Sequence, residues 1–194
     1  MSGWAARRIV TPRLIVRAFQ PEDAPDLYDY LSSPEIYRFE PGEPVDRQRA
    51  EELAMEMSTA SDFWAAELQA DRKVVGQVHF KQVEPLHVMT RGLGYIVSPH
   101  YQRRGYASEA ISALLRNGFA SAGIHRIVAH CSPENPASWR LLEKMGFRRE
   151  GLLKKEAFFR KDADGRPLWT DTLVYAILED ELSLDGDRPE RGVT

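Results

Sequence analysis

A short apolar strand, a glycine-containing loop and a long amphipathic helix follow one another in the middle of this chain. The apolar run covers residues 93–97 and stops at Ser98-Pro99, and the loop reads Gln102-Arg103-Arg104-Gly105-Tyr106-Ala107. In such a loop, successive backbone N–H groups lie at a helix N-terminus, where they lack helical partners and the helix dipole is positive. Gly105 lets an anion approach the backbone, and the small Ala107 lets the helix pack close to the strand. The pattern predicts a site for a pyrophosphate-like group.

The alternative interpretation of this stretch is a plain strand-to-helix turn with two solvated arginines. Two other phosphate-binding patterns are excluded, because no Gly-Lys-Ser/Thr closes the loop and no Gly-x-Gly-x-x-Gly occurs in it. The strand before the loop and the helix after it are the context that an anion-binding loop requires, so we favour the anion site.

A second pattern follows one helix later. Residues 126–131 read as a buried strand, and Asn135-Pro136 then provides an N-cap with proline at the first helical position. The helix runs to Met145 and ends at Gly146-Phe147. Asn135 and Ser138 also have a purely structural interpretation, because both side chains suit a helix N-terminus.

The two patterns together resemble the GNAT acyltransferase superfamily over residues 11–181. Residues 102–107 match its acyl-CoA-binding motif, and Asn135-x-x-Ser138 with Gly146-Phe147 resembles its second signature. The resemblance implies a mixed α/β fold whose partly antiparallel central sheet is flanked by helices. It also implies that the sheet is splayed between its two central parallel strands, residues 93–97 and 126–131.

The resemblance further implies acetyl-CoA as co-substrate and no metal. The residues that it places at the cofactor are Ile96, Val97, Gln102, Arg103, Arg104, Gly105, Tyr106, Ala107, Asn135 and Ser138. Many members carry a tyrosine that protonates the departing thiolate, but Leu142 stands at that position here. Ser138 is shared with the ribosomal-protein N-terminal (RimJ/RimL-type) acetyltransferase branch, which implies that Ser138 acts at the thiolate and that Asn135 orients pantetheine or a water.

We therefore expect an acetyl-CoA-dependent N-acetyltransferase that acts by direct attack of a primary amine, most simply a peptide or protein N-terminus. A small-molecule amine acyltransferase for a polyamine, an aminoglycoside or an amino acid is the first alternative, with a larger acyl group also open. A non-catalytic CoA-binding module is the second. The amine must lose a proton before attack, and Glu67, Glu156 and Asp171 are the candidate acceptors of that proton. Cys131 and His130 are weaker candidates for a nucleophile and a base.

Composition limits the remaining classes of function. The net charge of −3 and the absence of an interleaved basic and aromatic surface argue against nucleic acid, and no apolar run is long enough to span a membrane. The single cysteine and the lack of a secretory signal indicate the cytoplasm. Five scattered histidines show no metal-ligand spacing. The expected state is a monomer or homodimer.

Apolar periodicity predicts the other elements. Strands are expected at residues 13–18, 63–69, 73–82, 152–159 and 169–178, and helices at 21–31, 45–59, 106–122 and 136–145. Residues 35–44 and 84–90 are expected to be connections, and residues 182–194 a disordered tail.

Overall fold

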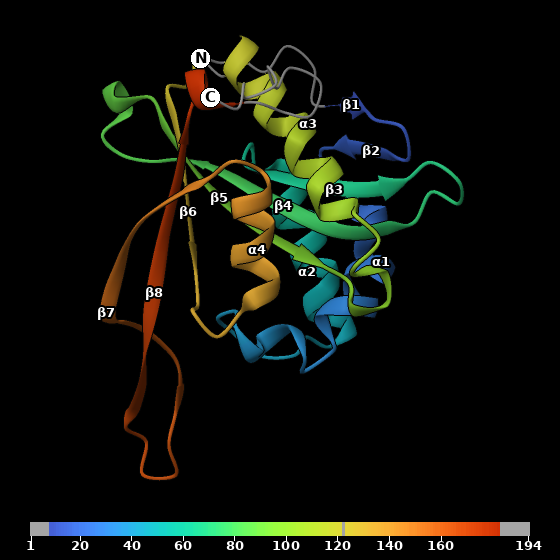
Figure 1. Cartoon of the computed structure of the whole chain (residues 1–194). Coiled ribbons are helices and arrows are strands. Elements are labelled where there is room, and N and C mark those ends of the chain that lie inside the picture. Colours follow the sequence, from blue (N-terminus) through green and yellow to red (C-terminus); the bar gives the residue numbers. More distant parts are fainter. Residues whose placement is uncertain (1–7, 122, 183–194) are drawn as a thin grey trace.

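A mixed eight-stranded sheet with the order β1-β2-β3-β4-β5-β6-β8-β7 forms the centre of the computed structural model, which describes residues 8–121 and 123–182 (Figure 1). Only β5 and β6 are parallel among the neighbouring strands of this described sheet. The strands are β1 (Arg8–Val10), β2 (Leu14–Arg17), β3 (Phe63–Leu68), β4 (Val74–Gln82), β5 (Thr90–Val97), β6 (Arg126–Cys131), β7 (Arg148–Lys161) and β8 (Pro167–Leu178).

Helices cover both faces of the sheet. Helices α1 (Ala24–Leu31) and α2 (Arg47–Thr59) pack on one face, and α3 (Tyr106–Ser121) and α4 (Pro136–Lys144) pack on the other (Figure 1). The alternation of side chains along a strand separates the two cores. In β3, Trp64 and Ala66 join the core beneath α3 and α4, whereas Ala65 joins the core beneath α1 and α2.

Helix α3 forms where the sequence predicts it, because its apolar residues recur on one face. Ala110, Ile111, Leu114 and Leu115 are all buried against the sheet. Gly123 follows the helix with a φ of +59°, a left-handed conformation typical of a glycine after a helix C-terminus. The helix therefore presents its N-terminus at the end of β5.

The two parallel strands separate part-way along their length. β5 pairs with β6 only from Thr90–Leu93 to Arg126–Ala129. Beyond that point β5 continues to Val97 along β4, and β6 continues to Cys131 along β8. Gly76 permits the close approach of β4 to β5, because a Cβ there would lie 2.5 Å from the carbonyl oxygen of Ile96. The expected splayed, mixed sheet is thus confirmed.

The β7–β8 hairpin extends well beyond the body of the domain (Figure 1). Both strands are longer than the sequence predicts, and the register shifts between Leu153 and Ala157, next to Lys155 with its φ of +51°. The short β1 was not predicted. The predicted tail lies almost wholly outside the described residues, so it stays a prediction. Over residues 8–121 and 123–182, no helix combines the length and apolarity that crossing a membrane needs.

Candidate active site

The loop before α3 has the backbone conformation of an anion-binding nest. Arg103 and Gly105 have φ values of +62° and +83°, and the side-chain amide of Gln102 donates to the carbonyl of Val97 at 3.1 Å. Among the described residues, the backbone N–H groups of Arg103, Arg104 and Gly105 donate to no acceptor. Alternating left-handed residues turn successive N–H groups toward one point. The loop thus leaves several donors available beside the positive end of α3.

An N-terminal contact holds this loop in place. Glu109 in the first turn of α3 accepts from Thr11 Oγ1 at 2.6 Å, and from both the backbone N and Nε of Arg13 at 2.7 Å. Arg13 Nη1 donates to the carbonyl of Arg104 at 2.9 Å, and its guanidinium lies over the ring of Tyr106. Partial burial alone would raise the pKa of Glu109, but the bonds from Thr11 and Arg13 outweigh it and lower that pKa. Arg13 therefore neutralises a carboxylate that would otherwise repel an anion at this helix end.

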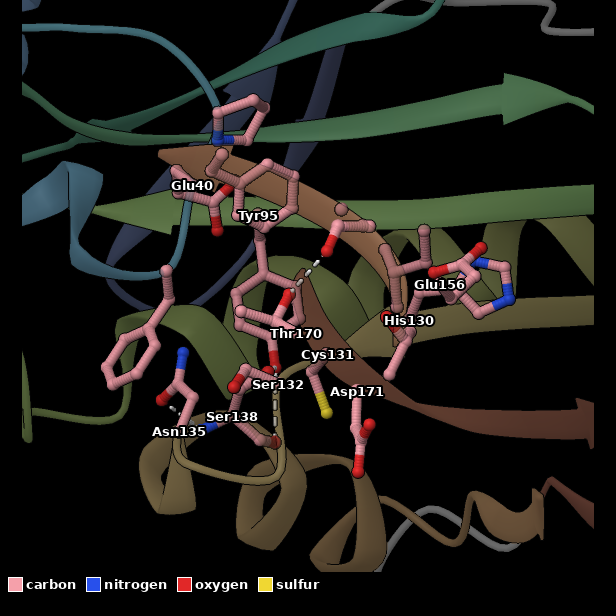
Figure 2. A pocket seen from close by; sticks show the side chains of 17 residues that line it. Glu40, Tyr95, His130, Cys131, Ser132, Asn135, Ser138, Glu156, Thr170 and Asp171 are labelled. Carbon is pink, nitrogen blue, oxygen red and sulfur yellow. Dashed lines mark hydrogen bonds between the residues drawn. The ribbon is translucent and has the colours of Figure 1, made fainter. Parts of the chain in front are cut away.

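Ser138 lies opposite the loop, in the first turn of α4. Its backbone N–H donates to Oδ1 of Asn135 at 3.2 Å, so Asn135 is the N-cap that the sequence predicts. The hydroxyl of Ser138 lies 2.9 Å from the hydroxyl of Tyr95, whose side chain extends from β5 (Figure 2). Burial raises the pKa of Tyr95 far above its usual value, partly offset by the bond to Ser138. Leu142 is fully buried in the core and takes no part in this cluster.

A cavity of about 270 Å³ opens at the point where β5 and β6 separate (Figure 2). Its walls come from the connection before α2, the separated ends of β5 and β6, the start of α4, and the hairpin strands β7 and β8. Its polar lining residues are Glu40, Tyr95, His130, Cys131, Ser132, Asn135, Ser138, Glu156, Thr170, Asp171 and Thr172, and its apolar ones include Phe39, Pro41, Leu93 and Phe159. Ser138 and Asn135 therefore share one cavity with three carboxylates.

The three carboxylates differ in their surroundings. Asp171 accepts from Lys154 Nζ at 2.7 Å and from the backbone N of Lys155 at 3.0 Å, and these bonds lower its pKa. Glu156 lies on the exposed strand β7. Glu40 is partly buried, and burial raises its pKa to about 7.

The expectation for Glu67 is wrong. Its side chain is only 1% exposed, with Arg17 Nε at 2.5 Å and Arg72 Nε at 2.7 Å from its carboxylate. Glu67, Arg17 and Asp23 form a buried ion-pair cluster that joins β3, β2 and the turn before α1, with the exposed Arg72 at its edge. Glu67 thus has the surroundings of a structural ion pair and is not among the residues that line the cavity.

The remaining predicted residues lie where the strands separate. Ile96 and Val97 belong to the part of β5 that has no β6 partner and pair with Gln77 and Gly76 of β4. Cys131 lines the cavity beside Ser138, and burial raises the pKa of its thiol. Sequence reasoning missed Glu40 and Tyr95. The sequence did offer one indication for Tyr95. It lies two residues after Leu93 in a predicted strand, so both side chains are on the same face of β5.

Comparisons with known proteins agree with this geometry. Residues 13–148 match the family model described as an acetyltransferase (GNAT) domain. The chain is 33% identical over 174 residues to the uncharacterized N-acetyltransferase YnaD of Bacillus subtilis, covering 89% of this chain and 98% of that protein. It is also similar to a solved GNAT-family acetyltransferase from Bacillus anthracis, with a TM-score of 0.81, 32% identity, and coverage of 90% and 99%.

A relative of the expected branch also matches. The ribosomal protein uS5-alanine N-acetyltransferase of Escherichia coli is 29% identical over 181 residues, covering 88% of this chain and 90% of that protein. Structurally similar proteins include acetyltransferases solved with CoA. The family match covers more than half of the chain and includes both the loop of residues 102–107 and the splayed strands. This protein therefore belongs to the GNAT family of acetyl-CoA-dependent acetyltransferases.

Proposed function

We propose that this acetyltransferase moves an acetyl group from acetyl-CoA to the primary amine of a peptide or protein N-terminus, in the cytoplasm and by direct attack. The observation that carries the proposal is the cavity at the open end of the β5–β6 gap, where Ser138 and Asn135 meet acidic side chains. An ammonium group enters such a cavity readily, because carboxylates lower the free energy of a cation there.

The chain's own groups fit acetyl-CoA. The free N–H groups of residues 103–105 suit its pyrophosphate, and the unpaired edges of β5 and β6 suit the amides of its pantetheine arm. When bound, acetyl-CoA supplies the acetyl group as an activated thioester. Backbone N–H groups near Ile96 and Val97 would polarise the thioester carbonyl. Ser138 would donate a proton to the leaving thiolate, supported by the hydroxyl of Tyr95.

The preference for a peptide N-terminus rests on the relative that acetylates an alanine of ribosomal protein uS5. A competition experiment tests it: peptides that begin with alanine, including one with the N-terminal sequence of uS5, compete with polyamines, aminoglycosides and free amino acids. Products are identified by mass spectrometry, and thiol release gives kcat/KM. We expect a peptide to be the best acceptor. A small amine that wins by more than tenfold, about 1.4 kcal/mol of transition-state binding, would exclude the peptide assignment.

A small cationic amine is the second candidate acceptor, and the acidic lining favours it. Glu40 and Glu156 contribute carboxylates that no lysine or arginine pairs with among the described residues. A compound with two or more ammonium groups would neutralise both. A non-catalytic CoA-binding role would give CoA binding in calorimetry but no acetylated product with any amine.

A further inference from the structure

We propose that Glu40 accepts the proton that the acceptor amine must lose before it attacks the thioester, an assignment that rests on the proposed function. Glu40 belongs to the connection between α1 and α2, which carries no motif of its own. It lines the cavity beside Tyr95, between Phe39 and Pro41 (Figure 2). It thereby shares one cavity with Ser138, the proposed donor to the thiolate.

The surroundings of Glu40 distinguish it from the other two carboxylates of the cavity. Asp171 already accepts from Lys154 and Lys155, and Glu156 is exposed on β7. Glu40 is partly buried, yet among the described residues it makes no hydrogen bond and no ion pair. A carboxylate in such a place lacks a counter-charge, which an incoming ammonium would supply. Burial raises its pKa to about 7, which suits a base that works near neutral pH.

The backbone that carries Glu40 is held from several sides. Arg160 Nη2 on β7 donates to the carbonyl of Tyr37 at 2.7 Å, and the Tyr37 hydroxyl donates to the carbonyl of Leu31 at 2.9 Å. Gly42 has a φ of +100°, and a Cβ there would lie 3.4 Å from the Tyr37 ring. The two hydrogen bonds hold the residues just before Glu40, which helps to position its carboxylate before any acceptor arrives.

The proton balance of the reaction follows from this assignment. The ammonium R–NH3+ gives one proton to the Glu40 carboxylate and becomes a neutral amine. The nitrogen lone pair then forms the C–N bond at the thioester carbon, and the C–S bond breaks with its electron pair on sulfur. Ser138 protonates that sulfur and recovers a proton from the nitrogen. The products are the amide, the free thiol and a protonated Glu40, which returns its proton to solvent.

The experiment is a pH profile of kcat/KM for the amine, measured with two acceptors whose amines have different pKa values. A peptide α-amino group titrates at about 7.8 and an alkylamine at about 10.4. With the unsubstituted protein, we expect kcat/KM to rise through about pH 7 for both acceptors, because this ascending limb reports the Glu40 carboxyl of the free enzyme. In Glu40→Gln, kcat/KM should fall about 100-fold, and its remaining rise with pH should follow the pKa of each amine. Glu40→Asp should keep the limb near pH 7 with reduced kcat.

Variants of the other titratable groups of the cavity are tested with the same pH profile. These groups are Tyr95 from β5, His130 and Cys131 from β6, Glu156 from β7 and Asp171 from β8. His130→Gln should leave the ascending limb near pH 7 in place. Glu156→Gln should raise KM for the amine without shifting the pH of that limb. Glu43→Gln, three residues along the same connection and exposed, should match the unsubstituted protein. Calorimetry of CoA binding and the melting temperature show that each variant is folded.

Failure of the proposed function and failure of the Glu40 assignment give different results. If the unsubstituted protein acetylates no amine, the proposed function falls and this assignment falls with it. If it acetylates amines and Glu40→Gln keeps both kcat and the limb near pH 7, the assignment to Glu40 alone is wrong. Loss of the limb in His130→Gln instead of Glu40→Gln would overturn it in the same way.

Discussion

The hydroxyl of Tyr95 lies 2.9 Å from Oγ of Ser138 and 3.2 Å from the carbonyl oxygen of the same residue. β5 thus supplies a phenol beside the serine, whereas position 142 carries a leucine buried in the core. The Tyr95 phenol is protonated throughout the neutral pH range, and burial raises its pKa further, so it can donate its proton to the carbonyl of Ser138, while either hydroxyl can be the donor in the contact with Oγ. The proposed proton donor to the thiolate is therefore a pair of residues.

Removal of either hydroxyl should slow the chemical step. We expect Ser138→Ala and Tyr95→Phe each to lower kcat by 10- to 100-fold, roughly 1.4–2.7 kcal/mol, with a smaller change in KM for acetyl-CoA. The double variant should lose little more than either single variant, because the two groups act together. The N-cap bond to Ser138 uses its backbone N–H and survives both changes. A lower melting temperature with intact turnover would reduce Ser138 to a helix-capping residue.

A substitution at Gly105 should weaken cofactor binding. Gly105→Asp forces a side chain onto a φ of +83°, brings a Cβ to 3.3 Å from Arg13 Nη2 and adds a negative charge at the proposed pyrophosphate site. We expect CoA affinity in calorimetry to fall at least tenfold. Gly165→Asp is the matched control, because Gly165 has a φ of +79° in the hairpin turn with nothing within 4 Å of its Cβ position. Equal CoA affinity in both folded variants would argue against the loop as the pyrophosphate site.

Arg13 should influence the same site through Glu109. Arg13→Ala leaves the Glu109 carboxylate with fewer donors at the N-terminus of α3 and releases the carbonyl of Arg104. We expect KM for acetyl-CoA to rise about tenfold, with kcat changed much less. Arg49→Ala, which breaks exposed ion pairs on α2, serves as the control. An unchanged KM in Arg13→Ala would show that the loop keeps its conformation without this contact.

Periodic elements such as α3 could be predicted from the sequence because they depend on neighbouring residues, and the apolar residues of α3 are buried as expected. The strand before residues 102–107 and the helix after them could be predicted for the same reason, whereas the left-handed conformation of Arg103 could not. Glu67 was a wrong candidate because nothing local shows that Arg17, fifty residues away, would meet it inside the sheet. Glu40 was missed for the same physical reason. Its connection has no pattern, and the contact that helps to place it joins Tyr37 to Arg160, 123 residues later.

Cys131 should have no covalent role, although it lines the cavity beside Ser138. Burial raises the pKa of its thiol, so little thiolate is present at neutral pH. Incubation with acetyl-CoA alone should therefore give no stable acetyl-cysteine by mass spectrometry, and Cys131→Ala should keep most of kcat. An adduct at Cys131 that an added amine discharges would establish a two-step reaction in place of direct attack.

Glu40 should also make the stability of the unliganded protein depend on pH. Its pKa is about 7 in the folded protein against an ordinary value of 4.5. Below pH 4.5 the carboxyl is protonated in both the folded and the unfolded chain, and its contribution to stability is fully present. As pH rises from 4.5 to 7, the unfolded chain releases this proton first, so the free energy of unfolding falls, and above pH 7 the total loss is about 3 kcal/mol. Glu40→Gln stays neutral, so chemical denaturation at pH 4 and pH 8 should show its stability advantage over the unsubstituted protein to be much larger at pH 8. An equal difference between the two proteins at both pH values would mean that the Glu40 carboxyl titrates at its ordinary pKa.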